Sequence, residues 1–240
     1  MKKKKKFLLL LLFVISGLLY YFIYSFGNNS EKDFIQEEIK IKRALDGDTL
    51  ELEDGRKVRM LGINTPEKGK FMSKEALEMT KTIENKKVIL LYNQKDKYGR
   101  VLGYIFFEGE NFNKKILENG LAHLYYYEKD RFFEEMKETE KRARENKKGI
   151  WKESRNKECV SLIKFDYKEK KRCNNEEILV LENSCNKSIK VLIKDDSTKQ
   201  TEEEIKQGIF SKNFSCAFND EGDSLYVWDN EGLILFYRYP

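Results

Sequence analysis

Three clusters of polar and charged residues in the middle of the sequence offer the groups that phosphodiester hydrolysis needs. Residues 46–49 (DGDT) place two carboxylates around a glycine, 59–67 (RMLGINTPE) supply an arginine, an amide and a carboxylate, and 96–100 (DKYGR) supply a second arginine. Carboxylate and amide oxygens suit a hard cation, guanidinium groups offset transition-state charge, and a free carboxylate can orient water. Each cluster alone is common in turns, so the hypothesis requires that the fold brings them together.

Short strands and turns must position these clusters. The Asp54-Gly55 pair is a strong hairpin signal. On one continuous strand over residues 57–63, Arg59, Leu61 and Ile63 would share a face. Strands are predicted over 35–44, 49–52, 57–63, 88–92 and 101–107, and helices over 73–84, 112–118 and 130–146. Five short strands with helices between and after them predict a small barrel of the oligonucleotide-binding type.

The chain changes character from residue 159 onward. Short apolar runs at 178–181, 189–193, 224–228 and 233–239, with almost no helical pattern, predict a separate all-β domain over 159–240. The cysteines all lie there, at Cys159, Cys173, Cys185 and Cys216. Their spacing fits no short zinc motif, and one or two disulfides are plausible in an exported chain, with all three pairings open.

Charge is distributed unevenly along the chain. The formal net charge is +5, the mean hydropathy is −0.69 and 36% of residues are charged, which predicts a heavily charged surface. Lys2 to Lys6 account for the whole excess, because the other 41 basic residues equal the 41 acidic ones. Residues 39–152 carry 26 basic and 20 acidic side chains, so this segment is the one suited to a polyanion. An ordinary mixed-charge surface would explain so modest a bias equally well.

The N-terminus carries a targeting signal. The lysines at 2–6 precede Phe7–Phe26, a run of 20 residues without a charge. At ~1.5 Å per residue, a helix of this length spans roughly 30 Å, the thickness of the hydrocarbon core of a bilayer. We therefore predict a transmembrane signal anchor in residues 1–27 and a linker in 28–38, with the rest of the chain on the extracytoplasmic side of the cell membrane. The alternative is a cleaved signal peptide that releases a secreted protein.

Residues 39–152 resemble the staphylococcal nuclease (thermonuclease) family over essentially the whole of that family's domain. The matching motifs occur in the family's order and at close to its spacing: DGDT at 46–49, RMLGINTPE at 59–67, DKYGR at 96–100, NGLA at 119–122 and GIW at 149–151. The resemblance implies a five-stranded barrel with three helices. It also implies a Ca²⁺-dependent nuclease that cuts DNA and RNA.

The resemblance also implies roles for single residues. Asp48 corresponds to a metal-binding aspartate, and Thr65 to the residue whose backbone carbonyl joins the coordination shell. Glu67 corresponds to the proposed general base, and Arg59 and Arg100 to the pair that holds the scissile phosphate.

Three further positions correspond to residues that contact the rest of the substrate. Lys97 and Tyr98 match residues that contact a second phosphate, and Tyr126 matches a tyrosine that packs on a base. Stacking on aromatic rings suits single strands, which we expect to be preferred. For Tyr126, packing in the core is an equally good interpretation. His123, the one histidine in the sequence, is expected to be structural.

The sequence departs from the family at three places. Asn64 stands where the family has its second metal-binding aspartate, so one negative charge is lost and a weaker or changed metal preference follows. The segment from Glu67 to Glu75 is shorter than the family's loop. Glu128 replaces a second tyrosine that contacts the nucleotide.

The C-terminal segment is similar, more faintly, to lamin-tail-type domains. The likeness lies in residues 176–183 and 219–229, and it implies an immunoglobulin-like sandwich that binds a cell-surface ligand or tethers the protein. The main hypothesis is thus an anchored nuclease without a small-molecule cofactor. The alternatives are an inactive nucleic-acid-binding barrel and a surface adhesin in which the sandwich does the main work.

Overall fold

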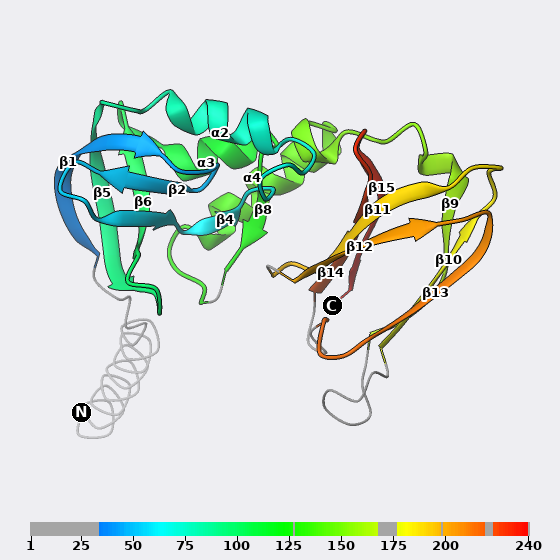
Figure 1. The fold of residues 1–240 in the computed structure, drawn as a ribbon. Helices are drawn as coiled ribbons and strands as arrows, with labels where there is room; N and C mark the ends of the chain where they lie inside the picture. Colours follow the sequence, from blue (N-terminus) through cyan, green and yellow to red (C-terminus); the bar gives the residue numbers. More distant parts are fainter. Residues whose placement is uncertain (1–33, 127, 168–176, 198, 219–222, 240) are drawn as a thin grey trace, which may run out of the picture. The chain divides into compact units, whose positions relative to one another are not determined.

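The computed structural model describes residues 34–126, 128–167, 177–197, 199–218 and 223–239 (Figure 1). The predicted signal anchor and most of the predicted linker lie outside these ranges. No helix within them is long and apolar enough to cross a membrane. Residues 34–240 belong to one compact unit, which contains both predicted domains.

The first half of this unit is a closed five-stranded barrel. Its strands are β1 (Ile35–Ala44), β2 (Thr49–Leu52), β3 (Lys57–Met60), β5 (Lys87–Lys95) and β6 (Val101–Phe107). They follow the order β3-β2-β1-β5-β6, and a parallel pairing of β3 with β6 closes the ring, with β7 (Glu110–Asn111) added beside β6. The predicted barrel is therefore confirmed, and β1 includes residues 35–38 of the predicted linker.

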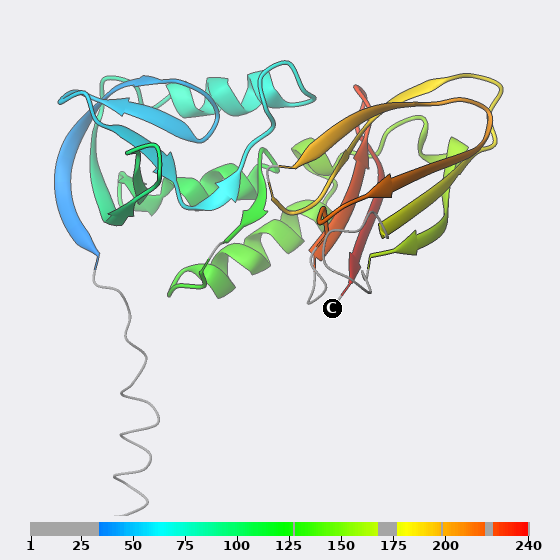
Figure 2. The same ribbon diagram turned by 60° about the horizontal axis from the view of Figure 1, so that its bottom comes forward.

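Three helices and a small ribbon complete the barrel (Figures 1 and 2). The helices are α2 (Ser73–Lys81), α3 (Phe112–Glu118) and α4 (Phe133–Glu145), and the ribbon pairs β4 (Gly62–Asn64) with β8 (His123–Tyr125). All three predicted helices are present, although α2 ends three residues early and α4 begins at Phe133. Apolar side chains of the strands and helices form one core that includes Leu50, Ile63, Ala76, Leu90, Ile105, Ile116 and Met136.

The strand predicted over residues 57–63 is broken in two, so this prediction was wrong. Gly62 has φ +77°, a left-handed conformation that favours glycine, and β3 ends before it. A Cβ on Gly62 would also lie 2.8 Å from the Tyr126 hydroxyl. As a result Ile63 enters the core, while the Arg59 side chain turns toward the β1–β2 turn.

The second half is all β, as predicted. One sheet has the order β13-β10-β9 and the other β12-β11-β14-β15, and side chains of both sheets share a second core. The strands are β9 (Val160–Asp166), β10 (Glu177–Asn183), β11 (Ile189–Lys194), β12 (Gln200–Ile205), β13 (Gly208–Phe214), β14 (Asp223–Trp228) and β15 (Leu233–Tyr239). Strands β9, β12 and β13 were missed because β12 is mostly polar, while β9 and β13 mix apolar and polar side chains without a continuous apolar run. The lamin-tail and immunoglobulin likenesses stay predictions.

The two halves are joined by packed contacts. After α4, the short helix η1 (Gly149–Trp151) places Ile150 and Trp151 in a third apolar cluster with Tyr226 and Trp228 of β14. The Trp228 indole N–H donates to the carbonyl of Ile150 at 2.9 Å, and Leu233 exchanges backbone hydrogen bonds with residues 152 and 154. The segment between the halves is therefore held against β15 by its backbone.

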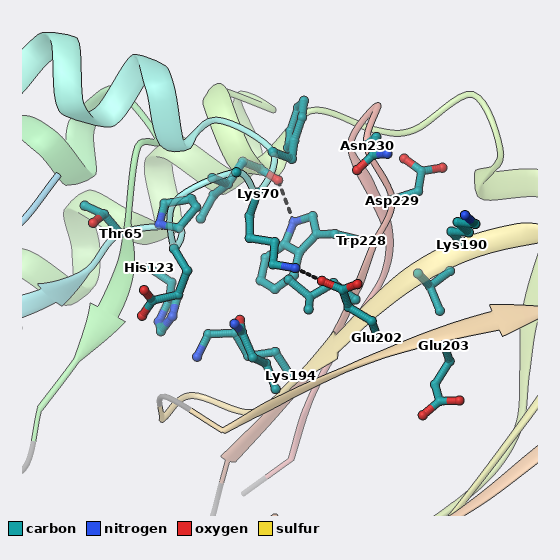
Figure 3. A pocket seen from close by; sticks show the side chains of 18 of the residues that line it. Thr65, Lys70, His123, Lys190, Lys194, Glu202, Glu203, Trp228, Asp229 and Asn230 are labelled. Atoms are coloured by element: carbon teal, nitrogen blue, oxygen red, sulfur yellow. Dashed lines mark hydrogen bonds and ion pairs between the residues drawn. The ribbon is translucent and has the colours of Figure 1, made fainter. Parts of the chain in front are cut away.

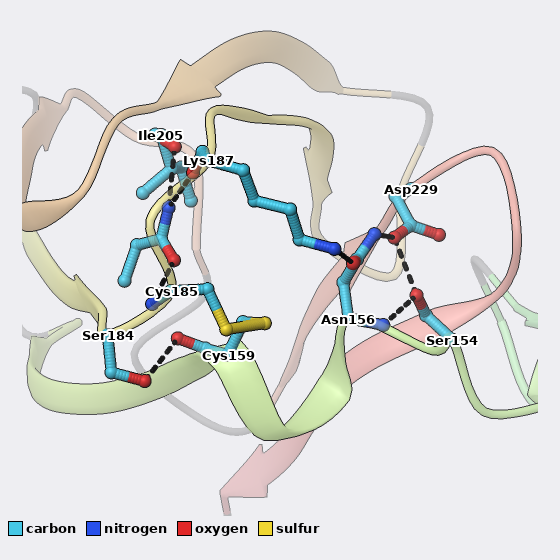
Figure 4. Close-up of a disulfide and its surroundings, with 9 residues drawn as sticks. Ser154, Asn156, Cys159, Ser184, Cys185, Lys187, Ile205 and Asp229 are labelled. Atoms are coloured by element: carbon cyan, nitrogen blue, oxygen red, sulfur yellow. Dashed lines mark hydrogen bonds between the residues drawn. A yellow bond between two sulfur atoms is a disulfide. The ribbon is translucent and has the colours of Figure 1, made fainter.

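A disulfide ties the start of the second half to its sheets (Figure 4). It joins Cys159, at the end of η2 (Lys157–Cys159), to Cys185 in the turn between β10 and β11. The Asn183 side chain braces this turn by donating to the carbonyls of Lys187 (2.7 Å) and Ile205 (3.0 Å). Cys216 is also disulfide-bonded, and Cys173 lies outside the described residues.

Replacing both partners of the first disulfide, Cys159→Ser with Cys185→Ser, tests its contribution. The bridge spans 26 positions of sequence, so its loss should lower the free energy of unfolding by about 2–4 kcal/mol. Urea unfolding followed by tryptophan fluorescence measures this change. Ser184→Ala is the matched control, because its hydroxyl makes only a 3.3 Å hydrogen bond to the carbonyl of Cys159. Equal midpoints for the double variant and the control would contradict the expectation.

Candidate active site

The buried carboxylate of Asp48 joins three segments of the barrel. Its Oδ2 accepts hydrogen bonds from the backbone N–H (2.8 Å) and the hydroxyl (3.0 Å) of Thr65. Its Oδ1 lies 3.2 Å from Nε of Arg59. The β1–β2 turn, β3 and the segment after β4 therefore meet at one side chain, and the first two predicted clusters are brought together.

The turn that carries Asp48 is held from both sides. Its backbone N–H donates to Oδ1 of Asp46 at 2.9 Å, which closes a local turn. A Cβ on Gly47 would lie 2.6 Å from the Thr65 hydroxyl and 2.8 Å from Cβ of Ala76, so only glycine allows this approach. Thr80 of α2 donates to the carbonyl of Gly47 at 2.7 Å. This hydrogen bond from α2 therefore helps to hold the turn beside Thr65.

Arg59 directs most of its donors to protein acceptors. Nη1 donates to the carbonyls of Met60 (2.6 Å) and Ile63 (2.8 Å), and Nη2 donates to Oδ1 of Asn64 (3.0 Å). Together with the Nε contact to Asp48, these bonds use four of the five N–H groups of a guanidinium. Its side chain is 12% exposed. In this arrangement Arg59 organises the site and has one N–H left for a substrate.

The orientation of Asn64 is set by His123, which is buried. Nδ1 of His123 faces the carbonyl of Leu124 at 3.1 Å and therefore carries the proton, so Nε2 accepts from the Asn64 amide at 3.2 Å. Burial, and next the positive charge of Lys194, lower the pKa of His123 well below its usual value and keep the ring neutral. The amide nitrogen thus points to His123 and the amide oxygen to Arg59. The prediction that His123 is structural agrees with this placement.

The oxygen atoms around Asp48 suit a hard cation. Burial of the Asp46 carboxyl, and next the negative charge of Asp48, raise the pKa of Asp46. Asp48, Asn64 and Thr65 offer carboxylate, amide and carbonyl oxygens, the donors that Ca²⁺ and Mg²⁺ prefer. Within the described ranges, no three His, Cys, Asp or Glu side chains are grouped as metal ligands. A cation here would therefore depend on the amide and carbonyl oxygens as well.

Glu67 lies at the edge of this cluster. It is exposed and begins a turn in which the N–H of Lys70 donates to its carbonyl at 2.9 Å. Asn64, Thr65 and Glu67 line a cavity of about 470 Å³, a volume in the usual range of ligand sites (Figure 3). Glu67 can therefore reach a molecule that occupies this cavity.

Arg100, Lys97 and Tyr98 belong to the turn between β5 and β6. Nε of Arg100 pairs with Asp96 at 2.8 Å, and the Tyr98 ring, 73% exposed, lies 5.1 Å from Nζ of Lys97. Arg100 directly precedes Val101, which is paired with Val58 beside Arg59. The third cluster is therefore in the turn that leads into β6, the strand next to β3, although no contact among the described residues joins Arg100 to Asp48.

Tyr126 packs into the barrel. Its hydroxyl lies 2.8 Å from the hydroxyl of Tyr104, which donates to Asp130 at 2.7 Å. Its ring meets Phe133 edge to face, with centroids 5.0 Å apart. These contacts support packing over base contact for Tyr126.

The second half of the chain also reaches this site, which the sequence patterns did not predict. Lys194, at the end of β11, lines the same cavity as Glu67, and Trp228 of β14 lines its far wall. The Asn64 amide nitrogen lies 3.5 Å from the carbonyl of Ser197. No spacing or motif could have linked residues 133 positions apart in the chain.

Comparisons with known proteins find sequences similar to this chain. The profile of the family described as staphylococcal nuclease homologue matches residues 57–153. The thermonuclease of Staphylococcus hyicus is 38% identical over 125 residues, 47% of this chain and 74% of that protein, and the thermonuclease of Staphylococcus intermedius is 35% identical over 135 residues, 51% and 80%. Endonuclease YncB of Bacillus subtilis (strain 168) is 31% identical over 131 residues, 48% and 62%.

Asp48→Asn tests whether the Asp48 carboxylate holds the site together. The amide would present a donor where the oxygen now accepts and would leave Arg59 without its charged partner. We expect the free energy of unfolding to fall by about 1–3 kcal/mol. Asp46→Asn is the control: it removes a like charge from the same turn and should change stability much less. Chemical unfolding of both variants decides, and equal effects would refute this role of Asp48.

Proposed function

Because this chain belongs to the staphylococcal nuclease family, we propose that it is a metal-dependent nuclease that hydrolyses phosphodiester bonds of DNA and RNA. The observation that carries the proposal is the convergence of Asp48, Arg59, Asn64 and Thr65, from three segments, beside a cavity that Glu67 lines. A barrel that only bound nucleic acid would not require an arginine, carboxylate and oxygen-donor cluster of this kind.

Nucleases of this family typically use Ca²⁺, and we infer the same class of cation here. Asp48, Asn64 and the carbonyl of Thr65 would hold it. When bound, such a cation offsets negative charge on the phosphate during hydrolysis. Asn64 contributes no charge, so we infer weaker Ca²⁺ affinity than two aspartates would provide, or use of another divalent cation.

The residues of the chain itself would divide the remaining work. Glu67 orients water or accepts its proton, and Arg100 binds the phosphate from the β5–β6 turn. Lys97 and the exposed ring of Tyr98 contact the neighbouring nucleotide. An exposed aromatic ring can stack on any base, which favours single-stranded substrates. In this proposal Tyr126 supports the fold beneath the site.

We also propose that the protein acts outside the cytoplasm, anchored by residues 1–27. The disulfide between Cys159 and Cys185 supports this location, since disulfides persist in oxidising compartments. A form released by cleavage of the leader is the alternative. Fractionation of cells into membrane and medium, followed by N-terminal sequencing, distinguishes the two.

An inactive nucleic-acid-binding barrel is the second candidate function. Two observations favour it: Asn64 in place of a carboxylate, and an Arg59 whose donors are largely occupied by the protein. Digestion of single-stranded and plasmid DNA by the full chain, with Ca²⁺ or with chelator, separates the two. Binding without cleavage in Ca²⁺, Mg²⁺ and Mn²⁺ would establish the inactive barrel.

Glu67→Gln tests the proposed reaction. The amide keeps the size of the side chain and cannot accept a proton from water, so kcat should fall by about 10²–10⁴-fold. Glu75→Gln, an exposed glutamate in the first turn of α2, is the matched control and should retain activity. Rates are measured on a fluorogenic single-stranded oligonucleotide, with thermal unfolding to verify the fold. Unchanged digestion by the Glu67→Gln protein would rule out the assigned role.

Arg100→Ala tests the second arginine. Loss of its charge beside the phosphate should lower kcat/KM by about 10²–10³-fold without unfolding the barrel. Arg56→Ala serves as the control, because Arg56 lies in the β2–β3 hairpin and pairs with Glu37 and Asp54. Equal activity of the two alanine variants would argue against a phosphate contact by Arg100.

A further inference from the structure

The cavity beside the nuclease site has walls from both halves of the chain. Asn64, Thr65 and Glu67 line it from the barrel, and strands β11, β12 and β14 line it from the second half. Figure 3 shows Lys194 extending toward the side on which Thr65 and His123 lie. A molecule that reaches the predicted metal-binding oxygens therefore also meets side chains of the second half.

The far wall of the cavity is held in place by specific contacts. The Trp228 indole donates to the carbonyl of Ile150 at 2.9 Å. Lys70, in the turn that follows Glu67, forms an ion pair with Glu202 of β12. The charged end of Arg238 in β15 lies 3.6 Å from the buried carboxylate of Glu140 in α4. These contacts give the second half a defined position against the barrel, so its side chains can take part in a built site.

Lys194 is the unusual residue of this wall. It is a lysine with 8% exposure, and its ammonium makes one hydrogen bond, 3.2 Å to the carbonyl of Asp195. It forms no ion pair with any carboxylate of the described ranges. Burial lowers its pKa to about 8, against the opposing charges of Asp195, Asp196, Asp223 and Glu67. The side chain is therefore mostly charged at pH 7 and keeps donors that are free for a ligand.

The barrel itself offers few free cationic N–H groups near Asn64 and Thr65. Arg59 has one N–H that is not already directed to a protein oxygen. Arg100 approaches from the β5–β6 turn and is paired with Asp96. The glutamates of the second half that line the cavity have partners of their own, because Glu202 pairs with Lys70 and Glu203 pairs with Lys212 at 2.6 Å. Lys194 lines the same cavity as Asn64 and Thr65 and pairs with no carboxylate of the described ranges, so its ammonium can bind a phosphate there.

Building on the nuclease function proposed above, we propose that Lys194 binds a backbone phosphate of the nucleic acid, so that the second half of the chain completes the substrate site of the barrel. The phosphate lies between the ammonium of Lys194 and the Asn64–Thr65 segment. The second half would thereby contribute to substrate affinity.

The test compares Lys194→Met and Lys194→Arg in the full chain, with Lys190→Met as the matched control. Lys190 lies on the same strand and lines the same cavity, but its side chain is exposed and lies on the far side from Thr65 (Figure 3). At pH 7 with Ca²⁺ and a fluorogenic single-stranded oligonucleotide, Lys194→Met should raise KM about tenfold to a hundredfold while kcat changes less. Lys194→Arg should restore most of the affinity, and Lys190→Met should resemble wild type.

The salt dependence of binding provides a readout that a purely structural role would not change. Losing one phosphate contact should reduce the slope of log KM against log salt by about 0.7 for a single strand. Equal KM and slope for Lys194→Met and Lys190→Met would overturn the inference, as would faster digestion by Lys194→Met, which would show that Lys194 blocks the site. If Lys194→Met does not fold, Lys194→Gln takes its place.

The outcome can be separated from that of the proposed function. A wild-type chain that fails to digest DNA with any divalent cation counts against the nuclease, whatever Lys194 does. Binding of the same oligonucleotide, measured by fluorescence anisotropy on Glu67→Gln protein with and without Lys194→Met, then still tests the phosphate contact. Loss of binding on adding Lys194→Met supports the inference, and unchanged binding refutes it.

Discussion

The carboxylate of Asp48 is buried at the meeting point of the β1–β2 turn, strand β3 and the segment after β4. A buried negative charge must be compensated by hydrogen bonds and an opposite charge, because burial without them is costly. Thr65 and Arg59 supply both. The same bonds hold Arg59 and the Asn64–Thr65 segment where a cation and a phosphate can be bound, so local stability and the proposed chemistry depend on one side chain.

Closure of the barrel also determines where the third cluster, residues 96–100, lies relative to Arg59. Strand β3 pairs in parallel with β6, and the register of Val58 with Val101 places Arg100 in the turn at the start of the strand that neighbours Arg59. The two arginines differ in their surroundings. Arg59 donates hydrogen bonds to backbone carbonyls and so holds the neighbouring segment in place. Arg100 is half-buried and has one carboxylate partner, Asp96. This difference suggests separate duties, with Arg59 shaping the site and Arg100 facing the substrate.

The all-β second half forms one wall of the cavity beside the candidate site. The family model matches residues 57–153, so the cavity wall formed by β11, β12 and β14 lies outside the matched segment. An apolar cluster with Trp151 and Trp228, backbone bonds at Leu233 and a disulfide at Cys159 hold that wall beside the barrel. The cavity beside the candidate site is therefore lined from both halves of the chain.

The sequence by itself determined the strands and helices of the barrel, since hydrophobic period and turn residues act over a few positions. It also identified the three clusters, because their residue types and order are explicit. Only the tertiary structure decided the break at Gly62. Its backbone is left-handed, which favours glycine, and the close approach of Tyr126 and Met136 leaves no room for a Cβ. The tertiary structure also decided which way the Asn64 amide points, through His123, and that Lys194 faces the site. Those features arise from contacts between segments far apart in the chain, and local patterns contain no information about which distant surfaces pack together.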